Sequence, residues 1–205
     1  MKKYDTANIR NIVLVGSKGV GKTTFVEAAL FATKVTVRMG RVVEGSSIID
    51  YDPIEIERKQ SITSKVTPVE LANCKINIID TPGYSDFIGD VVGAVAVADV
   101  VVALIDSVNG VDVQTLRFVN YAKKLNKPVV YFINKMDVER ADCNKALASI
   151  KDKLSPGAVL FELPIQTSLM EAVAECDEKL LEKYLEIGEL TEDEFKKGMV
   201  RGIAA

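Results

Sequence analysis

The chain has 205 residues, 48% hydrophobic and 27% charged, a composition that excludes a disordered protein and is sufficient for a substantial core. The formal net charge of −3 excludes an overall basic field for DNA or an anionic membrane, so any RNA contact has to be local. Three cysteines without Cys-x-x-Cys spacing argue against a zinc site or disulfide framework and favour a reducing cytoplasm. No apolar run approaches membrane-spanning length, and no signal-peptide core follows the N-terminus.

The first motif is a glycine-rich loop between an expected strand and an expected helix. Residues 11–15 form an apolar, β-branched run that predicts a buried strand, and residues 24–30 predict a helix. The residues between them match the phosphate-binding loop pattern: Gly16, Ser17, Lys18, Gly19, Val20, Gly21, Lys22 and Thr23. Such a loop directs backbone N–H groups and a helix N-terminus at a polyphosphate. Lys22 would reach the outer phosphates and Thr23 would hold Mg²⁺, whereas the alternative is a structural turn.

An irregular segment and a hairpin follow the first helix. Residues 34–59 lack periodicity, and long segments of this kind are usually functional or disordered. Residues 62–71 and 75–79 predict two strands that turn near Ala72 and Asn73.

The second strand of the hairpin leads into the sequence Asp-Thr-Pro-Gly at residues 80–83. Asp80, at a strand end, can hold Mg²⁺ through water, and the N–H of Gly83 can reach a terminal phosphate. The pattern alone usually marks a turn. Its position one hairpin after a phosphate-binding loop favours the second part of a nucleotide switch.

The third motif ends another buried strand. Residues 99–106 predict a strand of the doubly covered, parallel type, and a helix follows in which the apolar positions are Val113, Leu116, Val119 and Ala122. Residues 129–133 predict the next strand, which leads into Asn134, Lys135, Met136 and Asp137. Asp137 can accept hydrogen bonds from N1–H and the exocyclic amine of guanine, Asn134 can contact the other base edge, and the Lys135 stem can cover the base. Alone the motif could be a polar helix cap, but three motifs in order at strand ends favour a nucleotide site.

The C-terminal part is predicted to be mainly helical. A helix with the apolar positions Cys143, Leu147, Ile150 and Leu154 ends at residues 155–157. Residues 159–165 predict a strand interrupted by Pro164, and one long amphipathic helix is expected from Leu169 to Tyr184. Residues 191–194 begin a last helix with a capping box. We therefore expect a domain at residues 1–165 and a helical extension, packed on that domain, at residues 166–205.

With these motifs the chain resembles the GTPase domain of translational GTPases, and within them elongation factor G or its paralogues. The segments that carry the likeness are residues 80–87, 133–137, 170–175 and 180–186. The resemblance implies an α/β P-loop GTPase fold, a doubly wound and mostly parallel sheet with one antiparallel edge strand. It also implies GTP and GDP as ligands, Mg²⁺ as the metal, and a monomer that contacts large-subunit ribosomal RNA through its switch regions, without membrane or DNA partners.

The resemblance assigns roles to individual residues. Nucleotide contacts are expected from Gly16, Ser17, Lys18, Gly19, Val20, Gly21, Lys22, Thr23, Thr24, Asp80, Gly83, Asn134, Lys135 and Asp137. The Mg²⁺ ligands are expected to be Thr23, Ser61 and Asp80, with Thr63 as the alternative to Ser61. Catalytic roles are expected for Tyr84, Gly83 and Lys22.

The chain departs from the family pattern at the expected water site. Tyr84 replaces the family's His, and the chain contains no His at all. Lys18 and Gln60 occupy two positions that are apolar in relatives, Gly19 replaces an Asp of the phosphate loop, and Ser61 replaces the Thr of the first switch. A phenol titrates near pH 10 and is a poor base at pH 7, so we expect slow intrinsic hydrolysis of GTP to GDP and phosphate, with a partner supplying what is missing.

Two family elements have no counterpart in the sequence. A subdomain inserted at about residue 166 and a last strand ending in a Ser-Ala guanine loop are absent, which suggests an excised insert at Gln166 and a truncation at Ala205. The functional alternatives are a nucleotide-gated binding module, favoured by Tyr84, and a small regulatory GTPase, disfavoured by residues 169–205. Asp137 argues against an ATPase.

Overall fold

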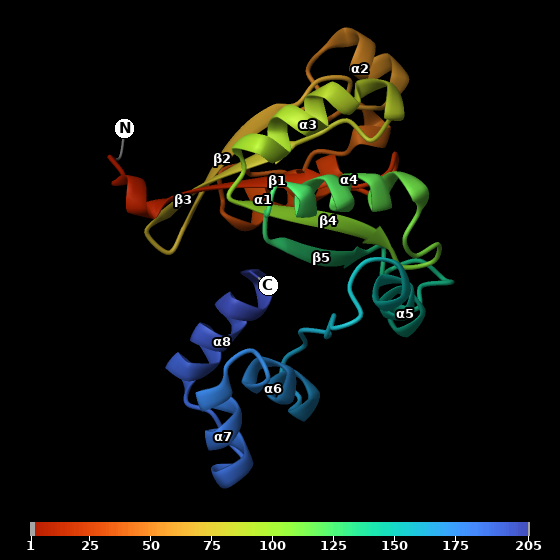
Figure 1. The fold of residues 1–205 in the computed structure, drawn as a ribbon. Coiled ribbons are helices and arrows are strands. Elements are labelled where there is room, and N and C mark those ends of the chain that lie inside the picture. The colour runs from red at the N-terminus through yellow and green to blue at the C-terminus, as the bar shows by residue number, and fades with distance from the viewer. Residues whose placement is uncertain (1–2, 205) are drawn as a thin grey trace. The chain divides into compact units, whose positions relative to one another are not determined.

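The computed structural model describes residues 3–204 (Figure 1). The chain divides into two compact units, one ending at Ala146 and the other beginning at Leu147, so that the division falls within α5 (Cys143–Lys153). The boundary expected near residue 166 separates a GTPase domain from a helical extension rather than two compact units, and it stays a prediction. None of the helices between residues 3 and 204 is long and apolar enough to cross a membrane.

A five-stranded sheet of order β2-β3-β1-β4-β5 forms the centre of the first unit (Figure 1). Its strands are β1 (Ile9–Val15), β2 (Lys65–Leu71), β3 (Cys74–Asp80), β4 (Val100–Asp106) and β5 (Val129–Asn134). β1 pairs in parallel with β3 and β4, and β4 pairs in parallel with β5, whereas β2 pairs antiparallel with β3. The predicted α/β fold, with a mostly parallel sheet and one antiparallel edge strand, is confirmed.

Helices cover both faces of this sheet. Along β1 the side chains alternate, so Leu14 and Val13 point to opposite faces, and both are fully buried. Leu14 packs with Val26 and Leu30 of α1 (Lys22–Ala32). On the other face α3 (Ile88–Val97) contacts β1, and α4 (Val113–Lys124) contacts β4 and α3 (Figure 1). Burial on both faces explains the continuous apolar sequences of β1 and β4.

The hairpin and the helix after β4 were predicted with small differences. Ala72 and Asn73 both have positive φ, 46° and 70°, the backbone that two-residue hairpin turns require. In α4 the buried side chains are Thr115, Phe118, Val119 and Ala122. Val113 is 67% exposed, so its expected place in the apolar stripe is wrong, because Asp112 caps the helix there by accepting from Thr115 N.

The segment expected to be irregular contains two short helices, η2 (Val42–Glu44) and α2 (Pro53–Arg58). The side chain of Asp52 accepts from Ile54 N at 2.8 Å, and Pro53 occupies the first turn, which are both helix-start signals. The structure also contains η1 (Thr6–Asn8) before β1 and η3 (Ser85–Phe87) before α3.

The second unit consists mainly of three helices, α6 (Thr167–Ala174), α7 (Glu178–Ile187) and α8 (Glu192–Ala204). Leu169, Val173 and Phe195 form its core. The single helix expected from Leu169 to Tyr184 is wrong, because the Asp177 side chain accepts from Lys179 N and Leu180 N and begins a new helix.

Two further predictions concern this unit. The capping box at Thr191 and Glu194 is confirmed, since each residue's side chain accepts from the other's backbone N–H. The strand expected at residues 159–165 is wrong: these residues have no strand structure. Pro164 lacks an N–H for a ladder, and Phe161 and Leu163 are 54% and 78% exposed.

Candidate functional site

The phosphate-binding loop connects β1 to α1, and close contacts explain its glycines. A Cβ atom on Gly16 would lie 2.9 Å from Leu104 O, and one on Gly21 would lie 2.4 Å from Asn134 Nδ2. Gly21 also has φ of 100° and precedes the first residue of α1. These positions exclude larger residues because the loop passes directly over the ends of β4 and β5.

Lys22, the first residue of α1, lies beneath this loop. Its ammonium donates to Gly16 O at 2.8 Å and to Ser17 O at 2.9 Å, and the residue is 6% exposed. Burial lowers the pKa of Lys22 to about 8, although Asp80 and Asp112 act in the opposite direction. A buried cation with a lowered pKa is suited to gain an anionic ligand.

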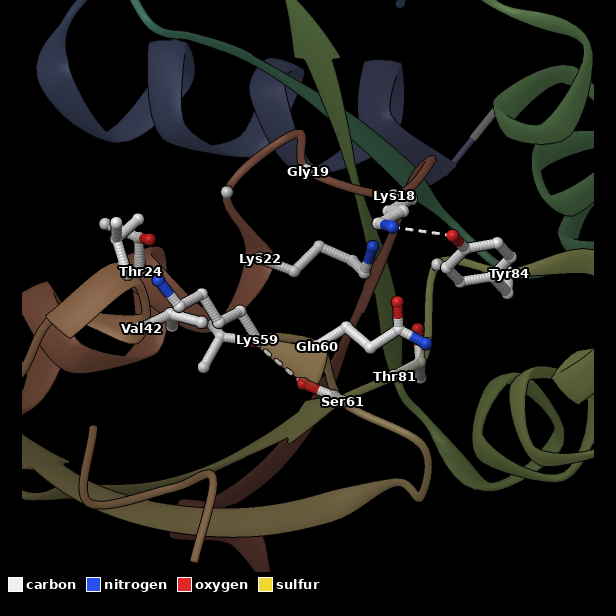
Figure 2. A pocket seen from close by; sticks show the side chains of 14 residues that line it. Lys18, Gly19, Lys22, Thr24, Val42, Lys59, Gln60, Ser61, Thr81 and Tyr84 are labelled. Atoms are coloured by element: carbon white, nitrogen blue, oxygen red, sulfur yellow. Dashed lines mark hydrogen bonds between the residues drawn. The ribbon is translucent and has the colours of Figure 1, made fainter. Parts of the chain in front are cut away.

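A pocket of about 210 Å³ opens beside the loop (Figure 2). Its wall is made of Lys18, Gly19, Gly21, Lys22, Thr23, Thr24, Val42, Val43, Lys59, Gln60, Ser61, Thr81, Gly83 and Tyr84. Three of these residues are lysines and none carries a carboxylate. Cations, hydroxyls and a helix N-terminus make this pocket suitable for a polyphosphate.

The residues expected to hold Mg²⁺ lie together. The Thr23 hydroxyl donates to Asp80 Oδ2 at 2.7 Å and lies 3.1 Å from the Ser61 hydroxyl. Asp80 is 1% exposed, and its other carboxylate oxygen, Oδ1, is buried and has no hydrogen-bond partner among residues 3–204. Oxygen ligands of this kind are those that Mg²⁺ prefers, so the residues fit this ion. Ser61 contacts Thr23, whereas Thr63 is exposed, which favours Ser61 over the alternative.

The environment of Asp80 keeps its proton affinity high. Burial raises the pKa of Asp80 to about 6, against the lowering effects of the Thr23 hydrogen bond and the Lys22 charge. A divalent cation would remove the penalty for the ionised form. Among residues 3–204 no group of three or more His, Cys, Asp or Glu side chains could hold a metal ion, so the predicted Mg²⁺ ligands are one carboxylate, that of Asp80, and the hydroxyls of Thr23 and Ser61.

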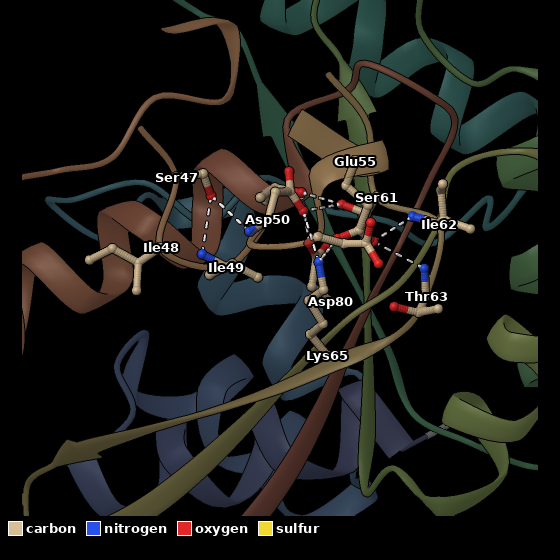
Figure 3. Close-up of polar contacts among 12 residues, drawn as sticks. Ser47, Ile48, Ile49, Asp50, Glu55, Ser61, Ile62, Thr63, Lys65 and Asp80 are labelled. Atoms are coloured by element: carbon tan, nitrogen blue, oxygen red, sulfur yellow. Dashed lines mark hydrogen bonds and ion pairs between the residues drawn. The ribbon is translucent and has the colours of Figure 1, made fainter. Parts of the chain in front are cut away.

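A buried ion cluster, which the sequence did not predict, holds the segment that carries Ser61 (Figure 3). The Lys65 ammonium donates to Glu55 Oε2 and to Asp50 Oδ1. Glu55 Oε1 accepts from Ile62 N at 2.8 Å, and Asp50 Oδ1 accepts from the Ser61 hydroxyl at 3.0 Å. Burial alone would raise the pKa of Glu55, but the hydrogen bond from Lys65 lowers it below its usual value.

A second buried carboxylate anchors the start of the same segment. Glu27 of α1 is fully buried and accepts from the Ser47 hydroxyl and Ile48 N, both at 2.7 Å, and from Gly40 N at 3.1 Å. A Cβ on Gly40 would lie 2.6 Å from the Glu27 carboxylate. In the sequence, this anchoring role could be inferred only from the position of Glu27, a charged residue on the face of α1 that packs against the core.

The predicted base-recognition motif lies at the end of β5, beside the phosphate-binding loop. Asn134 Nδ2 donates to Val20 O at 2.8 Å, so the third motif contacts the first directly. Lys135 has φ of 62° and donates to Asp106 Oδ2 at 2.8 Å. Asp137 is exposed in the following turn. Burial tends to raise the pKa of Asp106, but the Lys135 hydrogen bond leaves it below its usual value.

Gly83 and Tyr84 lie where the segment after β3 meets the loop. A Cβ on Gly83 would lie 2.6 Å from Lys18 N and 2.7 Å from Lys22 Nζ. The Tyr84 hydroxyl accepts from Lys18 Nζ at 2.6 Å (Figure 2). The structure therefore gathers the predicted phosphate and Mg²⁺ residues at one pocket and its edge, with the base motif beside them. Their roles stay predictions.

A comparison with protein families decides the relationship. The model of the elongation factor Tu GTP binding domain matches residues 7–202. The chain belongs to this family. As a member of the elongation factor Tu GTP-binding domain family it is a P-loop GTPase domain of the translation-factor type, and its ligand is a guanine nucleotide.

A solved structure supports this relationship over nearly the whole chain. A crystal structure of a protein from Thermus thermophilus is similar with a TM-score of 0.84 and 29% sequence identity. The similarity covers 97% of this chain but 36% of that protein. The chain thus corresponds to about a third of the length of this larger protein.

Proposed function

We propose that the chain binds GTP with Mg²⁺, hydrolyses GTP to GDP and phosphate, and serves as the nucleotide-binding domain of a ribosome-associated factor of the elongation factor G type. The observation that carries this proposal is the convergence of Thr23, Ser61 and Asp80. Thr23 and Ser61 line a pocket whose wall, among the described residues, contains three lysines and no carboxylate. Residues 166–205, which include α6, α7 and α8, are proposed to be the helical extension of this factor type.

The proposed mechanism relies on positioning and charge. The loop N–H groups and Lys22 bind the phosphates, and the Gly83 N–H contacts the terminal one. Thr23, Ser61 and a water held by Asp80 would hold Mg²⁺, which neutralises phosphate charge. A water oxygen bonds to the γ-phosphorus as the bond from that phosphorus to the bridging oxygen breaks. GDP leaves with the electron pair of the broken bond, and both water protons end on inorganic phosphate.

Tyr84 is proposed to orient the attacking water, because a neutral phenol can donate or accept a hydrogen bond but does not remove a proton at pH 7. Without a stronger base the intrinsic reaction is expected to be slow. The segment between α1 and β2 offers surface for a partner, since Val37 and Tyr51 are 99% and 73% exposed. The ribosome is the proposed partner, and loss of the γ-phosphate would release this segment.

Hydrolysis with and without ribosomes tests this proposal against its alternatives. We expect single-turnover GTP hydrolysis by the chain to be slow alone and to rise about a thousandfold with ribosomes, the scale of catalytic groups supplied by a partner. Ribosomes without the chain provide the control.

Two results would redirect the assignment. Binding of GTP without hydrolysis in either condition would favour a nucleotide-gated binding module, which the replacement of the family's His by Tyr84 already suggests. Hydrolysis that ribosomes leave unchanged would favour a small regulatory GTPase.

A further inference from the structure

The pair formed by Lys18 and Tyr84 joins two segments that are 66 residues apart. Lys18 Nζ lies 2.6 Å from the Tyr84 hydroxyl oxygen and 4.6 Å from the centroid of the ring. The phosphate-binding loop supplies Lys18, and the segment after β3 supplies Tyr84. Both residues line the pocket (Figure 2).

The backbone of Lys18 lies next to Gly83 and to the Lys22 ammonium. Lys18 N and Lys22 Nζ both lie close to the position that a Cβ on Gly83 would occupy, at 2.6 Å and 2.7 Å. Lys22 and Gly83 are the groups proposed to contact the outer phosphates. The loop therefore presents Lys18 beside the two groups that are proposed to contact the outer phosphates.

The charge of Lys18 is not neutralised by its partner. Within residues 3–204 the contacts of the Lys18 ammonium are with the neutral Tyr84 hydroxyl and ring, and none is with a carboxylate. An ammonium has three N–H donors, so one can remain on the hydroxyl while others reach phosphate oxygens. The simpler alternative is a surface lysine packed on an aromatic ring.

We propose that Lys18 binds the terminal phosphate of GTP and that Tyr84 positions the Lys18 ammonium for this contact. This inference rests on the proposed function. GDP lacks the γ-phosphate, so the contact distinguishes the triphosphate from the diphosphate. The same cation stabilises the charge that develops on the phosphoryl oxygens during transfer, an effect that requires a preorganised position.

The test compares Lys18→Met with wild type and with Lys18→Arg. Affinities for GDP and for a non-hydrolysable GTP analogue are measured by titration in Mg²⁺. Lys18→Met is expected to weaken binding of the GTP analogue by about tenfold to a hundredfold, the scale of a hydrogen bond to a charged group. Binding of GDP should weaken by less than about twofold. Lys18→Arg should keep most of the wild-type preference for the GTP analogue over GDP. Lys18 is exposed, so thermal unfolding should be unchanged.

Tyr84→Phe tests the positioning role. It should reduce the preference for the GTP analogue over GDP, but by less than Lys18→Met does. The double variant should show the same preference as Lys18→Met alone, because both changes act on one interaction. Lys59→Met is the matched control, since Lys59 also lines the pocket. It is expected to change both affinities by the same factor.

The outcomes separate this inference from the proposed function. If wild type binds neither GDP nor the GTP analogue, the proposed function fails. If wild type binds both and Lys18→Met keeps the same ratio of affinities, or if Lys59→Met changes that ratio equally, the inference about Lys18 fails alone. Additive effects of Lys18→Met and Tyr84→Phe would overturn the positioning role of Tyr84.

Discussion

Replacement of Asp137 by Asn is expected to change the preferred base from guanine to xanthine. The carboxylate accepts from N1–H and the exocyclic amine of guanine. An amide offers one acceptor and one donor, which mismatches guanine but matches N1–H and the C2 carbonyl of xanthine. A site that hydrogen-bonds a polar group rejects an analogue lacking it by about four orders of magnitude. The ratio of GTP and XTP affinities, measured by competition, should invert on this scale.

The position of Asp137 makes this experiment specific. Its side chain is exposed in the turn after β5, so the substitution should leave the fold intact. Glu139→Gln is the matched control, because Glu139 is exposed in the same turn region and has no proposed base contact. An unchanged preference for GTP over XTP in Asp137→Asn would show that this motif does not read the base.

The substitution Lys22→Met is expected to weaken binding of GDP and GTP by at least about a hundredfold, because it removes a buried charge-assisted partner of the phosphates. The thermal stability of the protein without nucleotide should not fall. Lys22 is 6% exposed and burial lowers its pKa to about 8. Its charged form therefore costs stability, on the order of 3 kcal/mol below pH 8, which offsets the lost hydrogen bonds to the loop carbonyls.

The pH dependence of the wild type provides an independent readout of the same residue. The pKa of Lys22 in the folded chain, about 8, is below the ordinary value of 10.5, and a phosphate ligand favours the charged form. Below pH 8 the titration of Lys22 should therefore leave the nucleotide affinity unchanged. Above it the affinity should fall by up to about tenfold per pH unit. A large loss of stability in Lys22→Met, or wild-type binding that is flat from about pH 7 to about pH 9.5, would contradict this account.

The strands and motifs of the first unit could be predicted because their signals are local. The apolar, β-branched run before Gly16 and the one before Asn134 each predict a strand without knowledge of the rest of the chain. The three motifs were predicted to follow strands, and they meet because the carboxyl ends of parallel strands lie at one edge of a sheet. The hydrogen bond between Asn134 and Val20 O shows this proximity directly.

The missed features depend on contacts between distant residues or on one capping side chain. The carboxylates of Glu27, Asp50 and Glu55 bind groups in a segment without periodicity, and no sequence spacing indicates those partners. The apolar stripe of the expected long helix continues through Cys176, but the cap made by Asp177 ends that continuity. In residues 159–165 the apolar composition resembled a strand, although the folded chain exposes Phe161 and Leu163.

The most direct test of the central claim, a guanine-specific polyphosphate site, is competition on the wild-type chain in Mg²⁺. Labelled GDP is bound first, and unlabelled GTP or ATP is then titrated against it. We expect GTP to displace the label at concentrations near its own dissociation constant, and ATP to require about ten-thousandfold more, because Asp137 rejects the base. Equal displacement by ATP, or no binding of labelled GDP, would contradict the account.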